Sequence, residues 1–70
     1  MRYNSPKEIG LGEYVIYQGR SYQVLVNYII GETDKTGYTP KTNRTILIDD
    51  GGRKVVVNDY RTMEVVGWIT

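Results

Sequence analysis

The stretch RTILIDDGGRKVVVNDYRTMEVVGW, from Arg44 to Trp68, decides the fold. Two runs rich in β-branched residues flank Gly51-Gly52, and a third follows the polar link Asn58–Thr62. Such runs, bounded by turn residues, predict strands. The stretch therefore predicts a hairpin, a short connection and a closing strand.

The hairpin register follows if Gly51-Gly52 is a two-residue turn, because paired glycines supply the positive φ angles of the primed turns. Asp50 then lies opposite Arg53, with opposite charges flanking the turn. On the buried face this register pairs Ile48 with Val55 and Ile46 with Val57; on the other face it pairs Asp49 with Lys54 and Leu47 with Val56. A one-residue slip would expose both isoleucines, so we expect burial to resist it.

Length and composition bound the protein class. Seventy residues form one small domain with a thin core, and no cysteine is present to support it by a disulfide. No apolar run approaches the ~20 residues that span a bilayer, and Met1–Gly10 lacks the apolar stretch of a signal peptide. We therefore expect a cytoplasmic protein. A net charge of +1 does not by itself indicate nucleic-acid binding.

The first half of the chain predicts a second hairpin. Residues 1–12 are expected to begin as a loose segment, pinned at its end by Ile9 and Leu11. Strands near 13–18 and 21–30 flank Gly19-Arg20, which suits a type II′ turn and places Tyr17 opposite Tyr22. The inward set is then Val15, Tyr17, Tyr22, Val24, Val26, Tyr28 and Ile30. Because the other face is also apolar, we expect a bulge or bend near Asn27.

The remaining segments complete a five-strand order. Gly31–Asn43 is polar and contains Pro40, which predicts a long loop. Asn58–Thr62 suits one turn of 3₁₀ helix, capped by Asn58 or Asp59. The last three strands are expected near 44–50, 53–58 and 63–69.

This order resembles the SH3-like small β-barrels, which include KOW, Tudor and SH3 domains. The segments YVIYQGRSYQVLV, ILIDDGGRKVVV and NDYRTMEVV carry the resemblance and span most of the chain, although no family motif is intact. The resemblance implies an all-β, five-stranded barrel with a long loop after the second strand and a 3₁₀ turn before the fifth. Small size without a family motif also resembles phage or prophage gene products.

Catalysis is not expected. The chain has no His and no Cys, so the commonest general base and the soft nucleophile are missing. Asp49 and Asp50 are adjacent in a strand and point to opposite faces, and their spacing is not that of a calcium loop. We read them as charges that flank a turn, and predict no enzyme, cofactor, metal or small-molecule substrate.

Protein binding is the leading functional hypothesis, with a second copy of the chain or a host protein as partner. Tyr is enriched in contact surfaces, and small barrels leave strand edges that can accept another chain. The candidate contacts are Tyr38 in the long loop and the apolar set Tyr14, Ile16, Leu25 and Ile29. The competing interpretation is that this set belongs to the core of a closed barrel.

Nucleic-acid binding is the alternative. Residues 35–61 contain six basic and three acidic residues, a net of +3, interleaved with Tyr38 and Tyr60. Basic residues with aromatic neighbours suit backbone contact and base stacking. The candidate contacts are Lys35, Lys41, Arg44, Arg53, Lys54, Arg61 and Tyr60; the competing interpretation is a solvated basic face.

Overall fold

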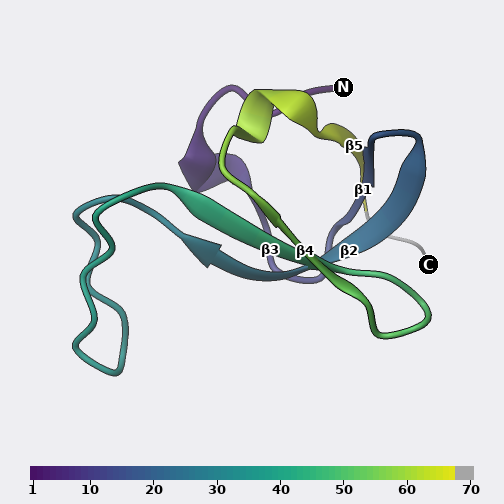
Figure 1. Cartoon of the computed structure of the whole chain (residues 1–70). Coiled ribbons are helices and arrows are strands. Elements are labelled where there is room, and N and C mark those ends of the chain that lie inside the picture. The colour runs from purple at the N-terminus through teal and green to yellow at the C-terminus, as the bar shows by residue number, and fades with distance from the viewer. Residues whose placement is uncertain (68–70) are drawn as a thin grey trace.

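A computed structural model of the chain describes residues 1–67 and shows an all-β protein (Figure 1). Its strands are β1 (Tyr14–Tyr17), β2 (Arg20–Tyr28), β3 (Arg44–Ile48), β4 (Lys54–Val57) and β5 (Glu64–Gly67). Two 3₁₀ turns accompany them, η1 (Pro6–Glu8) and η2 (Tyr60–Thr62). Residues 1–67 contain no α-helix.

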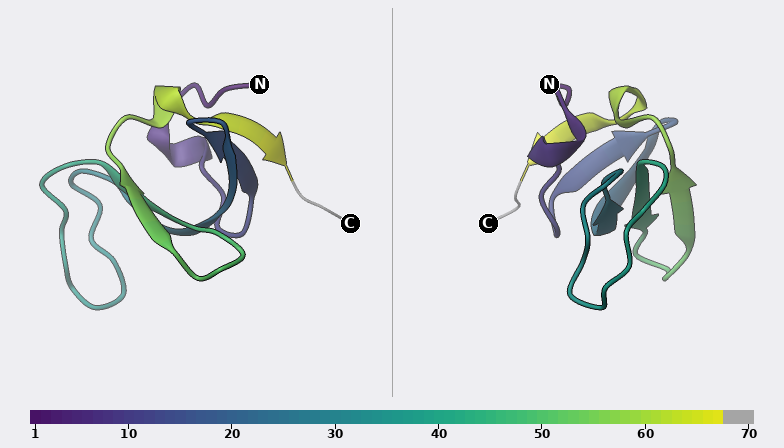
Figure 2. Two further views of the ribbon diagram at one scale, coloured as in Figure 1. Left: turned by 45° about the vertical axis from the view of Figure 1, so that its right-hand side comes forward. Right: turned by 90° about the vertical axis from the view of Figure 1, so that its left-hand side faces the viewer.

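The five strands form one antiparallel sheet in the order β4-β3-β2-β1-β5. Figure 1 and Figure 2 show that the sheet curls strongly, and that the loop between β2 and β3 extends away from its body. Within residues 1–67 the sheet is open, because β4 and β5 each pair with a single neighbouring strand. These two strands are its edges.

The all-β prediction is confirmed, and each predicted strand overlaps an observed one. The predicted 3₁₀ turn is η2, and Asp59 caps it by accepting a hydrogen bond from the backbone N–H of Arg61. The predicted end of the fifth strand, at residues 68–69, lies outside the described residues. The local signals for strands and caps therefore operate as expected.

The core lies inside the curl of the sheet. Its buried apolar members are Tyr3, Ile9, Val15, Tyr22, Val24, Leu47, Val57 and Met63. Leu47, Met63 and Val15 are completely enclosed. Burying a side chain of this size stabilises the folded state by about 1.5–3 kcal/mol, so these few residues dominate the stability of a small domain.

The predicted β3–β4 register is wrong by one residue. Ile48 pairs with Lys54, Leu47 with Val55, Ile46 with Val56 and Thr45 with Val57. The loop contains three residues, Asp50 to Gly52, and only Gly52 of its two glycines has a positive φ, 83°. The slip buries Leu47 and Thr45 in the core, whereas Ile46 and Ile48 remain half-buried on the outer face.

The predicted β1–β2 turn is displaced by one residue. Gln18 and Gly19 form it with φ angles of 51° and 77°, so it is a type I′ turn rather than a II′ turn at Gly19-Arg20. Val15 therefore pairs with Tyr22, and Tyr17 with Arg20. The pairing shifts by two residues, which leaves the side chains of β1, and those of β2 as far as Val24, on their predicted faces because strands alternate with period two.

A bulge in β2 lies between Val24 and Val26, two residues before the predicted position at Asn27. The extra residue, Leu25, interrupts the alternation, so Asn27 turns inward opposite Thr45. Val26, Tyr28 and Ile30 were predicted to point inward. The first two instead share the outer face, opposite Ile46 and Arg44, and Ile30 is exposed.

The N-terminal segment contributes to the core although its start was expected to be loose. Tyr3 and Ile9 are both buried, and Leu11, expected to help pin the segment, is 61% exposed. The Tyr3 hydroxyl donates a 2.7 Å hydrogen bond to Glu13 Oε1, which also accepts from the Gly10 backbone N–H. The segment is therefore packed against the start of β1.

Candidate functional site

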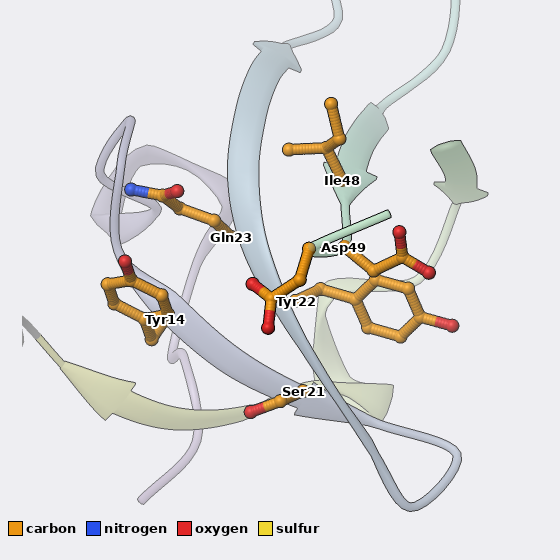
Figure 3. A pocket seen from close by; sticks show the side chains of 7 residues that line it. Tyr14, Ser21, Tyr22, Gln23, Ile48 and Asp49 are labelled. Atoms are coloured by element: carbon orange, nitrogen blue, oxygen red, sulfur yellow. The ribbon is translucent and has the colours of Figure 1, made fainter. Parts of the chain in front are cut away.

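A pocket of about 280 Å³ opens between the β1–β2 hairpin and the end of β3 (Figure 3). Its lining combines aromatic, aliphatic, amide, hydroxyl and carboxylate groups: Tyr14, Ser21, Tyr22, Gln23, Ile48, Asp49 and Asp50. The volume lies just below the range typical of small-molecule sites. It suits one side chain of a partner better than a whole cofactor.

Strand pairing places the pocket residues. Tyr14 pairs with Gln23, and Gln23 pairs with Ile48, so these three form a row across β1, β2 and β3. Ser21 is two residues from Gln23 and therefore on the same face. Figure 3 shows Tyr22 and Gln23 directed to opposite sides of β2. The row forms the floor of the pocket.

The two carboxylates border the pocket because of the three-residue loop. Asp49 Oδ1 accepts hydrogen bonds from the backbone N–H groups of Gly51 and Arg53, at 2.9 and 2.8 Å. The predicted pairs Asp49–Lys54 and Asp50–Arg53 belong to the two-residue turn, and the observed register does not form them. The ion pairs within residues 1–67 are Lys7–Glu32 and Arg61–Asp59. The Asp50 carboxylate is thus available to a ligand.

The Gln23 side chain is held in place on the pocket floor. Its Nε2 donates a 3.0 Å hydrogen bond to the backbone carbonyl of Gly12. The side-chain oxygen of the same amide remains as an acceptor. The pocket lining therefore offers acceptor oxygens from Gln23, Ser21 and Asp50, which suit a ligand that donates hydrogen bonds.

The predicted protein contacts do not form one surface. Tyr14 lines the pocket, and Ile16 follows it on β1, half-buried. Leu25 is the bulge residue of β2 and 40% exposed, and Ile29 is half-buried after the end of β2. Tyr38 lies on the long loop, with its ring at right angles to that of Tyr28 and the centroids 5.8 Å apart.

The long loop has internal order provided by Asp34. Its Oδ1 accepts from the backbone N–H groups of Thr36 and Tyr38 and from the Thr36 hydroxyl. These hydrogen bonds, that of the Thr36 hydroxyl first, lower the pKa of the Asp34 carboxyl. The backbone N–H of Gly31 donates to the carbonyl of Pro40 across the base of the loop. The loop is therefore a braced extension with exposed side chains.

The basic candidates are spread over three places. Lys35, Lys41 and Arg44 lie on the long loop and at its junction with β3, whereas Arg53 and Lys54 lie at the opposite end of the β3–β4 hairpin (Figure 1). The third place is η2, which contains Tyr60 and Arg61. The structure therefore does not gather them into one basic surface.

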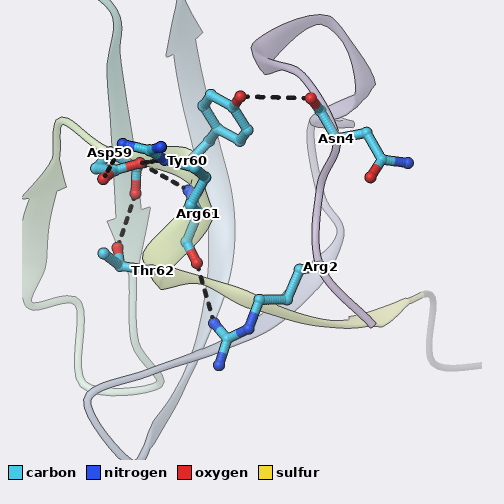
Figure 4. Close-up of polar contacts among 6 residues, drawn as sticks. All are labelled: Arg2, Asn4, Asp59, Tyr60, Arg61 and Thr62. Carbon is cyan, nitrogen blue, oxygen red and sulfur yellow. Dashed lines mark hydrogen bonds and ion pairs between the residues drawn. The ribbon is translucent and has the colours of Figure 1, made fainter.

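The η2 candidates have structural partners (Figure 4). Arg61 makes two hydrogen bonds to the Asp59 carboxylate, at 3.0 and 3.1 Å. These contacts lower the pKa of Asp59 and raise the pKa of Arg61. The Tyr60 hydroxyl donates to the Asn4 carbonyl, and Arg2 donates to the carbonyl of Arg61. Both candidates thus help to hold the N-terminal segment.

Sequence reasoning missed most of the pocket. Its residues come from three segments, and the carboxylates were interpreted as turn charges. A usable signal was the outward polar alternation of Ser21 and Gln23, directly after the hairpin turn. Only the register that places Ile48 beside Gln23 brings the segments together.

No protein-family model, curated protein or solved structure matches the chain significantly. Within residues 1–67, no helix is long and apolar enough to cross a membrane. The same residues contain no group of three or more Cys, Asp or Glu side chains placed to hold a metal ion.

Proposed function

We propose that the protein is a non-catalytic binding module for another protein, and that its pocket receives a basic side chain of that partner. The observation that carries the proposal is that Asp50 lines the same pocket as Tyr14, Gln23 and Ile48. A lysine or arginine side chain has an aliphatic stem and a cationic head that donates hydrogen bonds. The pocket offers a complementary surface to each part.

Each part of such a side chain has a partner in the pocket. The stem packs against Ile48 and the Tyr14 ring, which removes apolar area from water. The head reaches the Asp50 carboxylate, and charge-assisted hydrogen bonds are about twice as strong as neutral ones. A cation over a tyrosine ring adds about 0.5–1 kcal/mol at an exposed site.

The same carboxylates argue against a phosphate or an acidic side chain in this pocket. Two like charges close together repel each other, and the pocket wall contains Asp49 as well as Asp50. Ile16 follows Tyr14 on the same face of β1 and pairs with Ser21, so it extends the apolar contact area beside the pocket. A partner segment would therefore carry a basic residue that enters the pocket and a nearby apolar residue that packs on Ile16.

A capped Gly-Lys-Gly peptide is the probe that tests this function by ¹⁵N–¹H NMR titration. The amides of Gln23, Ile48 and Asp50 should shift in a saturable way, with a Kd on the order of millimolar for so small a ligand. Capped Gly-norleucine-Gly, which keeps the stem and lacks the charge, should bind several-fold more weakly. Asp50→Asn should weaken Gly-Lys-Gly selectively; equal shifts from both peptides, or an unaffected variant, would contradict the proposal.

The SH3-like small barrel is part of the same proposal. The strand order, the strong curl of the sheet and the 3₁₀ turn directly before β5 support it. A cytoplasmic location and a phage or prophage origin stay predictions from the sequence.

Nucleic acid is the second candidate partner, through the long loop alone. Lys35, Lys41 and Arg44 are exposed there, and Tyr38 is half-exposed among them. If this surface binds single-stranded oligonucleotides, affinity should fall steeply with added salt because phosphate contacts release counterions. Lys41→Glu with Arg44→Glu should then abolish binding. No binding of either single-stranded or duplex oligonucleotides at low salt would remove this candidate.

A further inference from the structure

The two edges of the sheet differ in how they are covered. On β5, the Val65 backbone N–H donates to the Met1 carbonyl, and Arg2 forms a bridge with Glu64. The N-terminal segment therefore occupies that edge. On β4, residues 1–67 provide no backbone partner beyond β3. One edge is protected by the chain itself and the other is open.

The backbone groups on the open edge belong to alternate residues. The Asp49 N–H donates to the Arg53 carbonyl, so Arg53 faces β3 with its backbone groups. Because these groups alternate along an antiparallel strand, those of Val55 and Val57 also face β3. The backbone groups of Lys54 and Val56 point away from β3. Open edges of this kind are templates for pairing with another strand.

The outer face next to this edge is apolar. Val26, Ile46 and Val56 form one row across β2, β3 and β4, and Val56 is 52% exposed. The residues at the two ends of β4 differ in charge. Arg53 precedes it and Lys54 is its first residue, whereas Asn58 and Asp59 follow it.

We propose that a second copy of this chain pairs with the β4 edge, antiparallel and centred on Val56. An antiparallel partner brings the basic start of one β4 beside Asn58 and Asp59 of the other, where the Asp59 carboxylate is shared with Arg61 of its own chain, and it keeps the two basic starts apart. Centring on Val56 also keeps the two Lys54 side chains apart; a pairing centred on Lys54 would oppose them directly, which is unfavourable.

The register explains why the partner is a second copy. A two-fold axis through Val56 pairs the free N–H and C=O of Val56 with the same groups of the other chain. Lys54 then pairs with Asn58 of the second copy, with its backbone groups on the same edge. The rows of Val26, Ile46 and Val56 on the outer faces of the two copies then join into one apolar strip, which removes the exposed Val56 side chains from water. This interface does not use the pocket and goes beyond the pocket function.

Single-cysteine crosslinking tests the register, because the chain contains no native cysteine. Residues directly opposed in a hydrogen-bonded antiparallel pair have Cα atoms about 5.5 Å apart, within the disulfide range. Val56→Cys should therefore oxidise to a covalent dimer. Val66→Cys, equally exposed at 56% on the covered edge strand β5, is the matched control and should remain monomeric. Efficient crosslinking of Lys54→Cys in place of Val56→Cys would overturn the register.

Val56→Glu tests the association itself by sedimentation analysis at millimolar protein. It places two like charges opposite each other, so the dimer Kd should rise by about tenfold or more. Val66→Glu carries the same charge change and should dimerise like the unmodified chain. A monomeric unmodified chain, or equal weakening by both variants, would overturn the proposal. Failure here is distinguishable from failure of the pocket function, because Val56→Glu should leave the Gly-Lys-Gly titration unchanged.

Discussion

The Thr45 hydroxyl donates a 2.8 Å hydrogen bond to the Asn27 side-chain oxygen at the border of the apolar core. Thr45 is 3% exposed, and the Asn27 amide nitrogen donates in turn to the Pro6 carbonyl, at 2.9 Å. One polar chain therefore connects β3, β2 and η1. Buried polar groups cost stability unless they are hydrogen-bonded, so each member depends on the others.

Thr45→Val should destabilise the protein by about 1–2 kcal/mol. The two side chains have nearly the same shape, so the main change is that the Asn27 oxygen loses its donor. Urea unfolding of Thr45→Val, Asn27→Ala and the double variant measures the coupling. We expect a coupling free energy of about 1 kcal/mol. Strictly additive effects would show that the hydrogen bond contributes nothing beyond the separate side chains.

Gly52→Ala should destabilise the hairpin by about 1–2 kcal/mol, whereas Gly51→Ala should be nearly neutral. Gly52 has a φ of 83°, where a Cβ is strained, and Gly51 does not have a positive φ. An added Cβ at Gly51 meets Asp49 Oδ1 at 3.5 Å, an ordinary contact. Thermal unfolding of both variants checks this. Equal losses would instead indicate the two-residue turn, in which both glycines need positive φ.

Stability should fall at high pH through Tyr3. Burial, followed by the hydrogen bond to Glu13 and the charge of Glu13, raises the pKa of the Tyr3 hydroxyl. A raised folded-state pKa gives a contribution that is complete below the unfolded value near 10 and is lost as pH rises above it. Between pH 8 and about 11, the free energy of unfolding measured in urea should therefore fall more steeply with pH for the unmodified chain than for Tyr3→Phe. Parallel profiles would exclude this role.

Asp34→Ala should loosen the tip of the long loop without changing the melting temperature. The variant removes the acceptor for the Thr36 and Tyr38 amides, and the loop buries little apolar area. Hydrogen bonds lower the pKa of the Asp34 carboxyl. The unmodified loop should therefore keep its order while Asp34 is ionised, and lose that order as the pH falls through the lowered pKa. ¹⁵N relaxation of these amides measures both effects. Lys35→Ala, at the exposed neighbouring position, is the control; equal loosening by both variants would contradict the role of Asp34.

Local sequence determined the elements. The alternation of β-branched and aromatic residues marks five strands, and Asp59 marks the 3₁₀ turn, because side-chain direction and capping depend on neighbours within a few residues. Of the candidate site, Tyr14 lines the pocket, and its predicted role as a protein contact stays a prediction. Asp49 was predicted to flank the turn, and it does so through backbone hydrogen bonds.

Tertiary packing decided the registers between paired strands, and the registers decided which side of the sheet each side chain occupies. Gly51-Gly52 is compatible with a two-residue or a three-residue loop, and enclosure of Leu47 together with the Asp49 hydrogen bonds selected the longer one. The bulge at Leu25 turned Asn27 inward, and Tyr3 closed the core from a segment without strand pattern. The pocket depends on all these choices, because it joins residues from β1, β2 and the end of β3. The register between strands is decided by contacts between residues distant in the chain, and the propensities of neighbouring residues do not contain those contacts.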